Sequence, residues 1–71
     1  MATNPIVELA EMVQQDFGKS IQARVVGKSG PDHMPVITVE IELPDGRIFE
    51  ASSSNQKLAK QRAAEIALEE Y

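Results

Sequence analysis

The stretch from residue 37 to residue 51 reads ITVEIELPDGRIFEA and predicts a β-hairpin. Up to Leu43 apolar and polar residues alternate strictly, which is the period of a strand with one buried side and one side facing water. Pro44-Asp45-Gly46 follows as a turn, because Pro fixes φ, Asp can bond its own backbone and Gly supplies a positive φ. Residues 47–51 form the returning strand. The hairpin indicates an antiparallel sheet with one apolar face.

Upstream of the hairpin, the sequence predicts a helix and a further strand. Within residues 5–17 the apolar side chains recur three and four apart, which gives a helix one buried stripe. Asn4 can cap this helix and Gly18 can close it. The predicted stripe consists of Ile6, Leu9, Ala10, Val13 and Phe17. Residues 21–26 alternate as a strand, and the turn-rich residues 27–35 predict a long, ordered loop.

Downstream of the hairpin, Asn55 caps a second helix that runs to about residue 70. Its predicted apolar contacts are Ala59, Ala63, Ile66 and Ala67, with Leu58 or Tyr71 as further candidates. The element order is therefore α-β-β-β-α. A three-stranded antiparallel sheet whose apolar face is covered by two helices is a two-layer α+β sandwich. The whole chain, residues 1–71, fits one domain with a core from about residue 5 to residue 70.

The composition restricts the classes of function. The chain has 71 residues, 42% of them hydrophobic, which suffices for one small folded domain but not for a large enzyme with its own cleft. It has no cysteine, which excludes disulfides, thiolate metal sites and a cysteine nucleophile. No membrane-spanning stretch or signal peptide is recognisable, so the expected location is intracellular, in the cytoplasm. With a net charge of −4, binding to a polyanion would depend on a local basic patch.

Three separate stretches carry a more specific pattern. The first helix contains a proline, a leucine, a glutamate and a glutamine at Pro5, Leu9, Glu11 and Gln14. The predicted loop reads GPDHMP at residues 30–35, and the second helix opens with NQKLAK at residues 55–60, followed by an alanine-rich tail. In this order and spacing, over residues 5–68, the stretches resemble the double-stranded RNA-binding domain, most of all the one at the C-terminus of bacterial ribonuclease III.

The resemblance implies recognition of the shape of an A-form duplex across two successive minor grooves and the phosphates between them, with little reading of base sequence. Glu11 and Gln14 would contact one minor groove, where RNA displays its 2′-hydroxyls. Pro31 and His33 would contact the next minor groove. The phosphate contacts would come from the start of the second helix, at Gln56, Lys57 and Lys60. There the free N–H groups and the partial positive charge of the helix N-terminus add to the side-chain charge.

Each of these residues also has an ordinary interpretation. Without the resemblance, Glu11 and Gln14 would be solvated residues of a polar helix face. His33 is the only histidine, and no cysteine or second histidine accompanies it, so a metal site has little support. Gln56 stands where the family usually has a lysine, so one expected phosphate charge is absent.

This departure and the acidic composition leave a second hypothesis open. The chain would then be a degenerate copy of the same fold that serves as a protein-interaction or dimerisation module. A third class, an enzyme, would need converging catalytic groups. Glu40 and Glu42 share a strand face, but that face is predicted to meet solvent. We therefore expect a non-catalytic domain that binds double-stranded RNA, with no cofactor, metal or small-molecule substrate, as part of a ribonuclease III-like or other RNA-processing protein.

Overall fold

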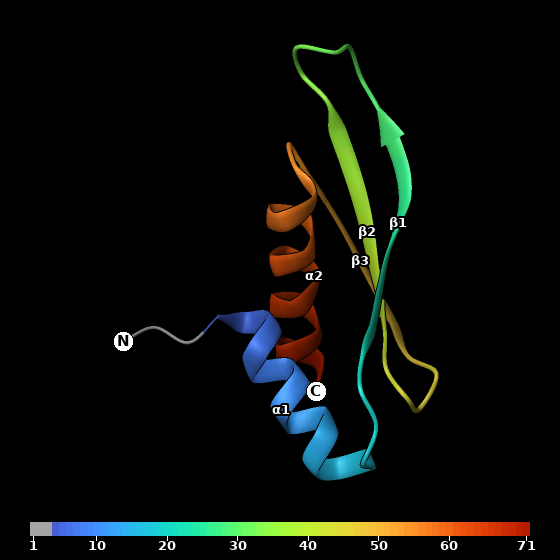
Figure 1. Ribbon diagram of the computed structural model, residues 1–71, viewed down its shortest axis with the longest axis vertical. Coiled ribbons are helices and arrows are strands. Elements are labelled where there is room, and N and C mark those ends of the chain that lie inside the picture. The colour runs from blue at the N-terminus through green and yellow to red at the C-terminus, as the bar shows by residue number, and fades with distance from the viewer. Residues whose placement is uncertain (1–3) are drawn as a thin grey trace.

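The computed structural model describes residues 4–71 and shows two helices beside a three-stranded antiparallel sheet (Figure 1). In chain order the elements are α1 (Pro5–Phe17), β1 (Gln22–Ser29), β2 (Val36–Glu42), β3 (Ile48–Ser53) and α2 (Gln56–Glu70). The strands follow one another in the sheet as β1-β2-β3. Both helices lie on the same side of the sheet: α2 packs on β2 and β3, and α1 packs on α2 (Figure 1). The predicted α-β-β-β-α sandwich is confirmed.

The residues predicted to begin and end the helices do so. The Asn4 side chain accepts a hydrogen bond from the N–H of Ile6 at 2.8 Å, and Asn55 accepts one from the N–H of Leu58 at 2.8 Å. Gly18 closes α1 in the left-handed region at φ 68°, a conformation that costs side-chain-bearing residues energy. The expectation of no signal peptide rests partly on residues 1–3, which lie outside the described residues. Within residues 4–71, no helix is both long and apolar enough to span a membrane.

The core lies between α1, α2 and the inner face of β2. Leu9 and Val13 of α1 lie in one cluster with Ile41 of β2 and Leu43, which follows β2. Both sheet residues are apolar members of the predicted alternation, and both are buried. The fully buried side chains of α2 are all small, Ala59, Ala63, Ala64 and Ala67, and the partly buried Leu68 packs beside them. Short side chains let α2 lie close to its neighbours, so the helix is held by backbone proximity rather than by large apolar groups.

Three predicted apolar contacts are wrong. Leu58 and Ile66 of α2 are 43% and 39% exposed, and Phe17 at the end of α1 is 39% exposed. The physical reason on α2 is that Ala64 takes the buried position, because the helix turns its alanine stripe fully inward and leaves the larger residues at the rim. Tyr71 does pack against the core, as predicted.

The first strand is longer and the loop shorter than predicted. β1 continues to Ser29 because Gly27 and the two residues after it pair with β2 beyond a β-bulge between Val25 and Gly27. No helix packs on β1 to any extent, and Val25 and Val26 are each 46% exposed. The outer end of the β1–β2 hairpin therefore projects beyond the start of α2 (Figure 1).

Candidate nucleic-acid interface

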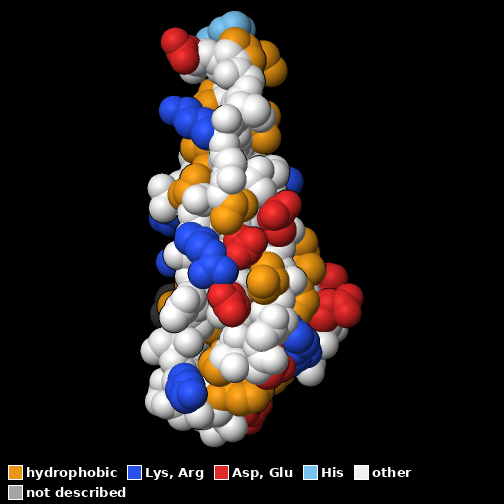
Figure 2. Space-filling model, turned by 90° about the vertical axis from the view of Figure 1, so that its right-hand side faces the viewer, with side chains coloured by type: hydrophobic (Ala, Val, Ile, Leu, Met, Phe, Trp, Pro, Cys, Tyr) orange, Lys and Arg blue, Asp and Glu red, His pale blue; other side chains and the backbone are white. Residues whose placement is uncertain are grey.

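The β1–β2 loop is shaped by one glycine and one backbone hydrogen bond. Gly30 has φ 83°, and a Cβ at this position would lie 2.5 Å from the carbonyl oxygen of Met34. The N–H of Met34 donates to the carbonyl of Pro31 at 2.9 Å and closes a tight turn. Pro31 and His33 are exposed on this turn, and the histidine is visible at the very end of the molecule (Figure 2). The sequence prediction that His33 lies at a loop tip agrees with this geometry.

The α1 residues singled out from the sequence share one exposed surface. Glu11 and Gln14 line a shallow hollow on α1 together with Val7 and Ala10. These four positions are spaced three and four apart and therefore form one stripe along the helix. Val7 is 48% exposed, so the stripe combines two polar side chains with an apolar flank. Such a surface suits a wide, shallow groove that displays both hydroxyls and sugar carbons.

The start of α2 presents a cationic edge. Gln56 and Lys57 are exposed and Lys60 is partly exposed. The Asn55 side chain accepts a hydrogen bond from the N–H of Leu58, while other N–H groups of the first turn have no partner within the helix. Ion pairs in residues 4–71 involve Arg24 and Arg47 but neither of these lysines. Both ammonium groups are thus available for a phosphate, next to the positive end of the helix dipole.

Arg62, the third basic residue near the start of α2, lies on a different side of the helix. It follows Lys57 by five residues, about 140° around the helix at 3.6 residues per turn. Its neighbours across a surface hollow are His33, Val36 and the serines at 52–54. Arg62 is close to these lysines in the chain, but the helical geometry places it apart from them.

Acidic residues collect on the opposite, outer face of the sheet. Glu40 pairs across strands with Glu50 and with Arg24, on the side away from the buried Val39 and Ile41. Arg24 bonds Glu40 at 2.9 Å and Glu42 at 2.7 Å, and these bonds, that to Glu42 foremost, raise the pKa of the guanidinium. Part of the net negative charge is thereby directed away from the lysines of α2. No group of three or more histidine or acidic side chains within residues 4–71 is arranged to hold a metal ion.

The three candidate segments succeed one another along the longest dimension of the molecule, which is 40 Å. Figure 1 shows α1 in the lower half, the start of α2 above it and the β1–β2 loop at the top. They do not converge on one pocket. An elongated ligand can contact all three, whereas a small molecule can contact only one.

Comparison with known proteins decides the family. The family model described as the double-stranded RNA binding motif matches residues 5–71, nearly the whole chain. The chain is a member of the double-stranded RNA-binding motif family. This double-stranded RNA-binding domain is 41% identical over 64 residues to ribonuclease 3 of Ehrlichia canis, with 83% of the chain and 28% of that protein covered. It is 38% identical over 68 residues to the mouse double-stranded RNA-specific editase B2, covering 96% of the chain and 8% of the editase.

A solved structure extends the likeness to three dimensions. The domain superimposes on a structure of Arabidopsis HYL1, described in connection with miRNA processing, with a TM-score of 0.78 and 30% identity, and 96% of each chain is covered. The domain spans only about a quarter of the ribonuclease 3 proteins that it matches, between 24% and 28% of their length. The similarity is therefore to one domain of each larger protein, and the matched family is defined by binding to double-stranded RNA.

Sequence reasoning missed one polar cluster. Tyr71, after the end of α2, bonds Asp16 of α1 and stacks on Arg47 at the start of β3. The sequence predicted Tyr71 as an apolar contact and Arg47 as a hairpin residue, but these residues and Asp16 are far apart in the chain, so no periodicity or spacing predicted the polar contacts among them.

Proposed function

We propose that this domain binds double-stranded RNA by shape, with α1 in one minor groove, the β1–β2 loop in the next and the start of α2 on the phosphates between them. The observation that carries the proposal is the order of the three segments along the 40 Å axis, which matches the order of grooves and phosphates on an A-form duplex. The proposal is supported by the membership of the chain in the double-stranded RNA-binding motif family and by Lys57 and Lys60 of α2, which form no ion pair within residues 4–71.

In this arrangement each side chain has a distinct role. Glu11 and Gln14 accept and donate hydrogen bonds at 2′-hydroxyls, which is how RNA is distinguished from DNA. Pro31 and His33 enter the second minor groove on a loop already fixed by its turn, which lowers the entropy lost on binding. The phosphate contacts are made by Gln56, Lys57 and Lys60.

The domain acts as a single non-catalytic module, residues 1–71, and any catalysis of a longer protein would lie in another domain. The names of ribonuclease 3 and of the double-stranded RNA-specific editase both refer to RNA. We therefore propose that the domain takes part in RNA processing inside the cell.

A second function remains a competing proposal because of two observations. The domain carries a net charge of −4, and glutamine replaces a lysine at position 56. Both weaken attraction to a polyanion. In this alternative the domain would bind a protein partner or a second copy of itself.

One titration separates the two functions. Amide NMR spectra of the labelled domain are recorded with a ~20 base-pair RNA duplex, the matching DNA duplex and the single strand, at low and moderate salt. We expect shifts in all three segments, residues 11–14, 31–34 and 56–60, with the RNA duplex alone, and with the DNA duplex only weak, salt-sensitive shifts at the phosphate-binding residues 56–60. A folded domain whose amides do not move at low salt would refute RNA binding and favour the protein-interaction module.

A further inference from the structure

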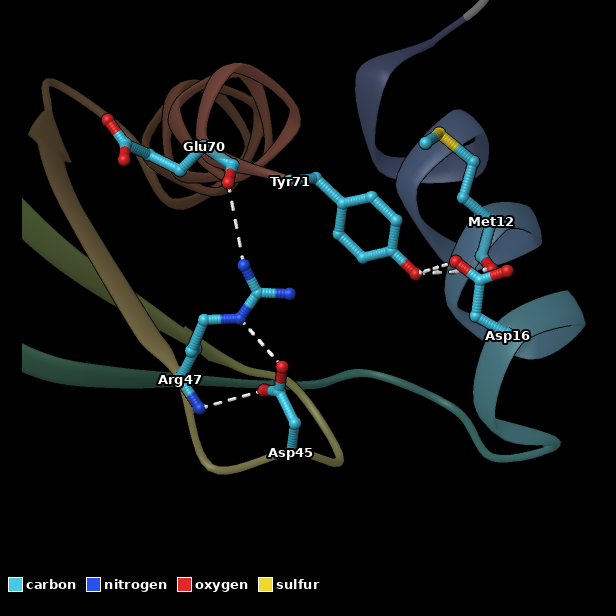
Figure 3. Close-up of polar contacts among 6 residues, drawn as sticks. All are labelled: Met12, Asp16, Asp45, Arg47, Glu70 and Tyr71. Atoms are coloured by element: carbon cyan, nitrogen blue, oxygen red, sulfur yellow. Dashed lines mark hydrogen bonds and ion pairs between the residues drawn. The ribbon is translucent and has the colours of Figure 1, made fainter.

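Tyr71 connects α1 to the rest of the domain through its hydroxyl group. The phenol donates a hydrogen bond to the carboxylate of Asp16 and lies 3.5 Å from the backbone carbonyl of Met12, both on α1 (Figure 3). The bond to Asp16, followed by partial burial, raises the pKa of Tyr71 above its ordinary value, so the phenol keeps its proton and this hydrogen bond over a wider range of alkaline pH. The ring itself is partly buried against the core.

Arg47 holds the same ring from the other side. Its guanidinium carbon lies 5.4 Å from the centroid of the Tyr71 ring, within the range of a cation–π contact. The guanidinium also donates to the carbonyl of Glu70 at 3.4 Å and pairs with Asp45 at 2.7 Å (Figure 3). Tyr71 is therefore fixed by the β2–β3 turn and by the last turn of α2, and it passes this constraint to α1.

The contacts that otherwise hold α1 carry little directional information. Leu9 and Val13 pack on the alanine surface of α2 and on Ile41 and Leu43 of the sheet side. Hydrophobic contact is not directional, and alanine methyl groups form a smooth surface. Among residues 4–71, the side-chain hydrogen bonds that join α1 to another element are those of Tyr71. The buried stripe of Leu9 and Val13 sets which face of α1 turns to the core, and the bonds of Tyr71 add a directional constraint at the end of the helix that carries Asp16.

This rotation matters for the surface that carries Glu11 and Gln14. Asp16 lies two residues after Gln14 on the same helix, so a rotation that releases Asp16 from Tyr71 turns the whole stripe. Lys57 and Lys60 lie at the other end of α2 and would keep their positions.

We propose that Tyr71 is a positioning residue for RNA recognition: by bonding Asp16 while stacked on Arg47, it sets the rotation of α1 at which Glu11 and Gln14 meet the minor groove. The inference rests on the function proposed above. It assigns to a residue outside the three contact segments a part of the preference for RNA over DNA.

The test uses three variants of the whole domain. Tyr71→Phe removes the hydroxyl and keeps the ring under Arg47. Asp16→Ala and Asp16→Asn remove the same charge, but only the asparagine keeps an oxygen that can accept the hydrogen bond. Dissociation constants for a ~20 base-pair RNA duplex and the matching DNA duplex are measured by fluorescence anisotropy over a salt series, with thermal denaturation of each variant alongside.

We expect Tyr71→Phe and Asp16→Ala to weaken RNA binding about threefold to tenfold, the range for residues that act on a site through packing. DNA binding and the salt slope should stay unchanged, because the phosphate contacts of α2 remain. Asp16→Asn should restore most of the loss. A residue with a purely structural role would lower the melting temperature without changing the RNA-to-DNA ratio in the folded domain.

Three results would overturn the inference. In the first, Tyr71→Phe and Asp16→Ala bind RNA as the wild type does. In the second, the two Asp16 variants behave alike, which would assign the effect to charge. In the third, RNA and DNA binding fall together. Absence of RNA binding by the folded wild type would instead refute the proposed function, and the inference with it, so the wild-type titration separates the two failures.

Discussion

Replacing Gln56 with lysine should tighten RNA binding by adding one phosphate contact at the start of α2. The side chain is exposed at the first position of α2, one residue before Lys57 and about one helical turn before Lys60. One added phosphate contact should steepen the dependence of log K on log salt by about 0.9 on the B-DNA scale. At about 0.1 M salt this corresponds to roughly eightfold tighter binding, or about 1.2 kcal/mol.

The same substitution should slightly destabilise the free domain. A positive charge in the first turn opposes the helix dipole and costs about 0.3–1 kcal/mol at low salt. Affinity and stability should thus move in opposite directions, which a general improvement of folding would not produce.

The assay compares Gln56→Lys with Gln22→Lys by anisotropy titration from low to moderate salt. Gln22 is exposed on the outer sheet face, paired with Glu42 across the strands, so it receives the same charge far from the candidate interface. Equal gains in both variants would show that net charge, rather than a contact at α2, controls binding. An unchanged salt slope in Gln56→Lys would refute the placement of phosphate at the start of α2.

Two further predictions concern stability. Gly30→Ala places a methyl group against the Met34 carbonyl at a positive φ and should cost about 1–3 kcal/mol, with weakened RNA binding. Gly18→Ala has a positive φ but open space around it, so thermal denaturation should show a smaller loss of about 1–2 kcal/mol and unchanged binding; equal losses would refute the importance of the clash. The backbone N–H of Arg47 lowers the pKa of Asp45, so the ionised carboxylate stabilises the fold fully above the unfolded pKa of about 3.9, and this contribution is lost as the pH falls through the lower pKa of the folded state. Asp45→Asn should therefore reduce the acid sensitivity of unfolding, and an unchanged pH profile in circular dichroism would contradict this.

Local rules predicted the elements whose signals are local. The strict alternation of residues 37–43, the Pro44-Asp45-Gly46 turn and the caps at Asn4 and Asn55 each depend on neighbours a few residues away. The structure agrees with them for that reason. The periodicity of residues 5–17, 21–26 and 55–70 predicted the remaining elements, whereas the family resemblance supplied all of the candidate contacts, because a polar residue such as Gln14 has no distinctive pattern of its own.

The features that escaped prediction depend on tertiary contacts. Gly27 and Ser29 are typical of turns, yet β1 continues through them because β2 offers partners beyond the bulge. Ala64 is buried in place of Ile66 because close packing against α1 and the sheet favours the smaller side chain. The Asp16–Tyr71 bond joins residues 55 positions apart, which no window of sequence can contain.

The outer end of the β1–β2 hairpin has little support from the rest of the sheet. β3 pairs with β2 as far as Ile37, so the last pair of the hairpin, Ser29 with Val36, has no third strand beside it. A two-stranded segment is only marginally stable, so we expect this end to bend more easily than the rest of the sheet. The bulge between Val25 and Gly27 adds a local bend to β1 just before it. Because His33 lies at this end, we expect its distance from α1 to adapt, in the proposed complex, to duplexes whose groove spacing is altered by a mismatch or a bulged nucleotide. The helices would then serve as a fixed reference, and the end of the hairpin would allow for the irregularity of natural RNA.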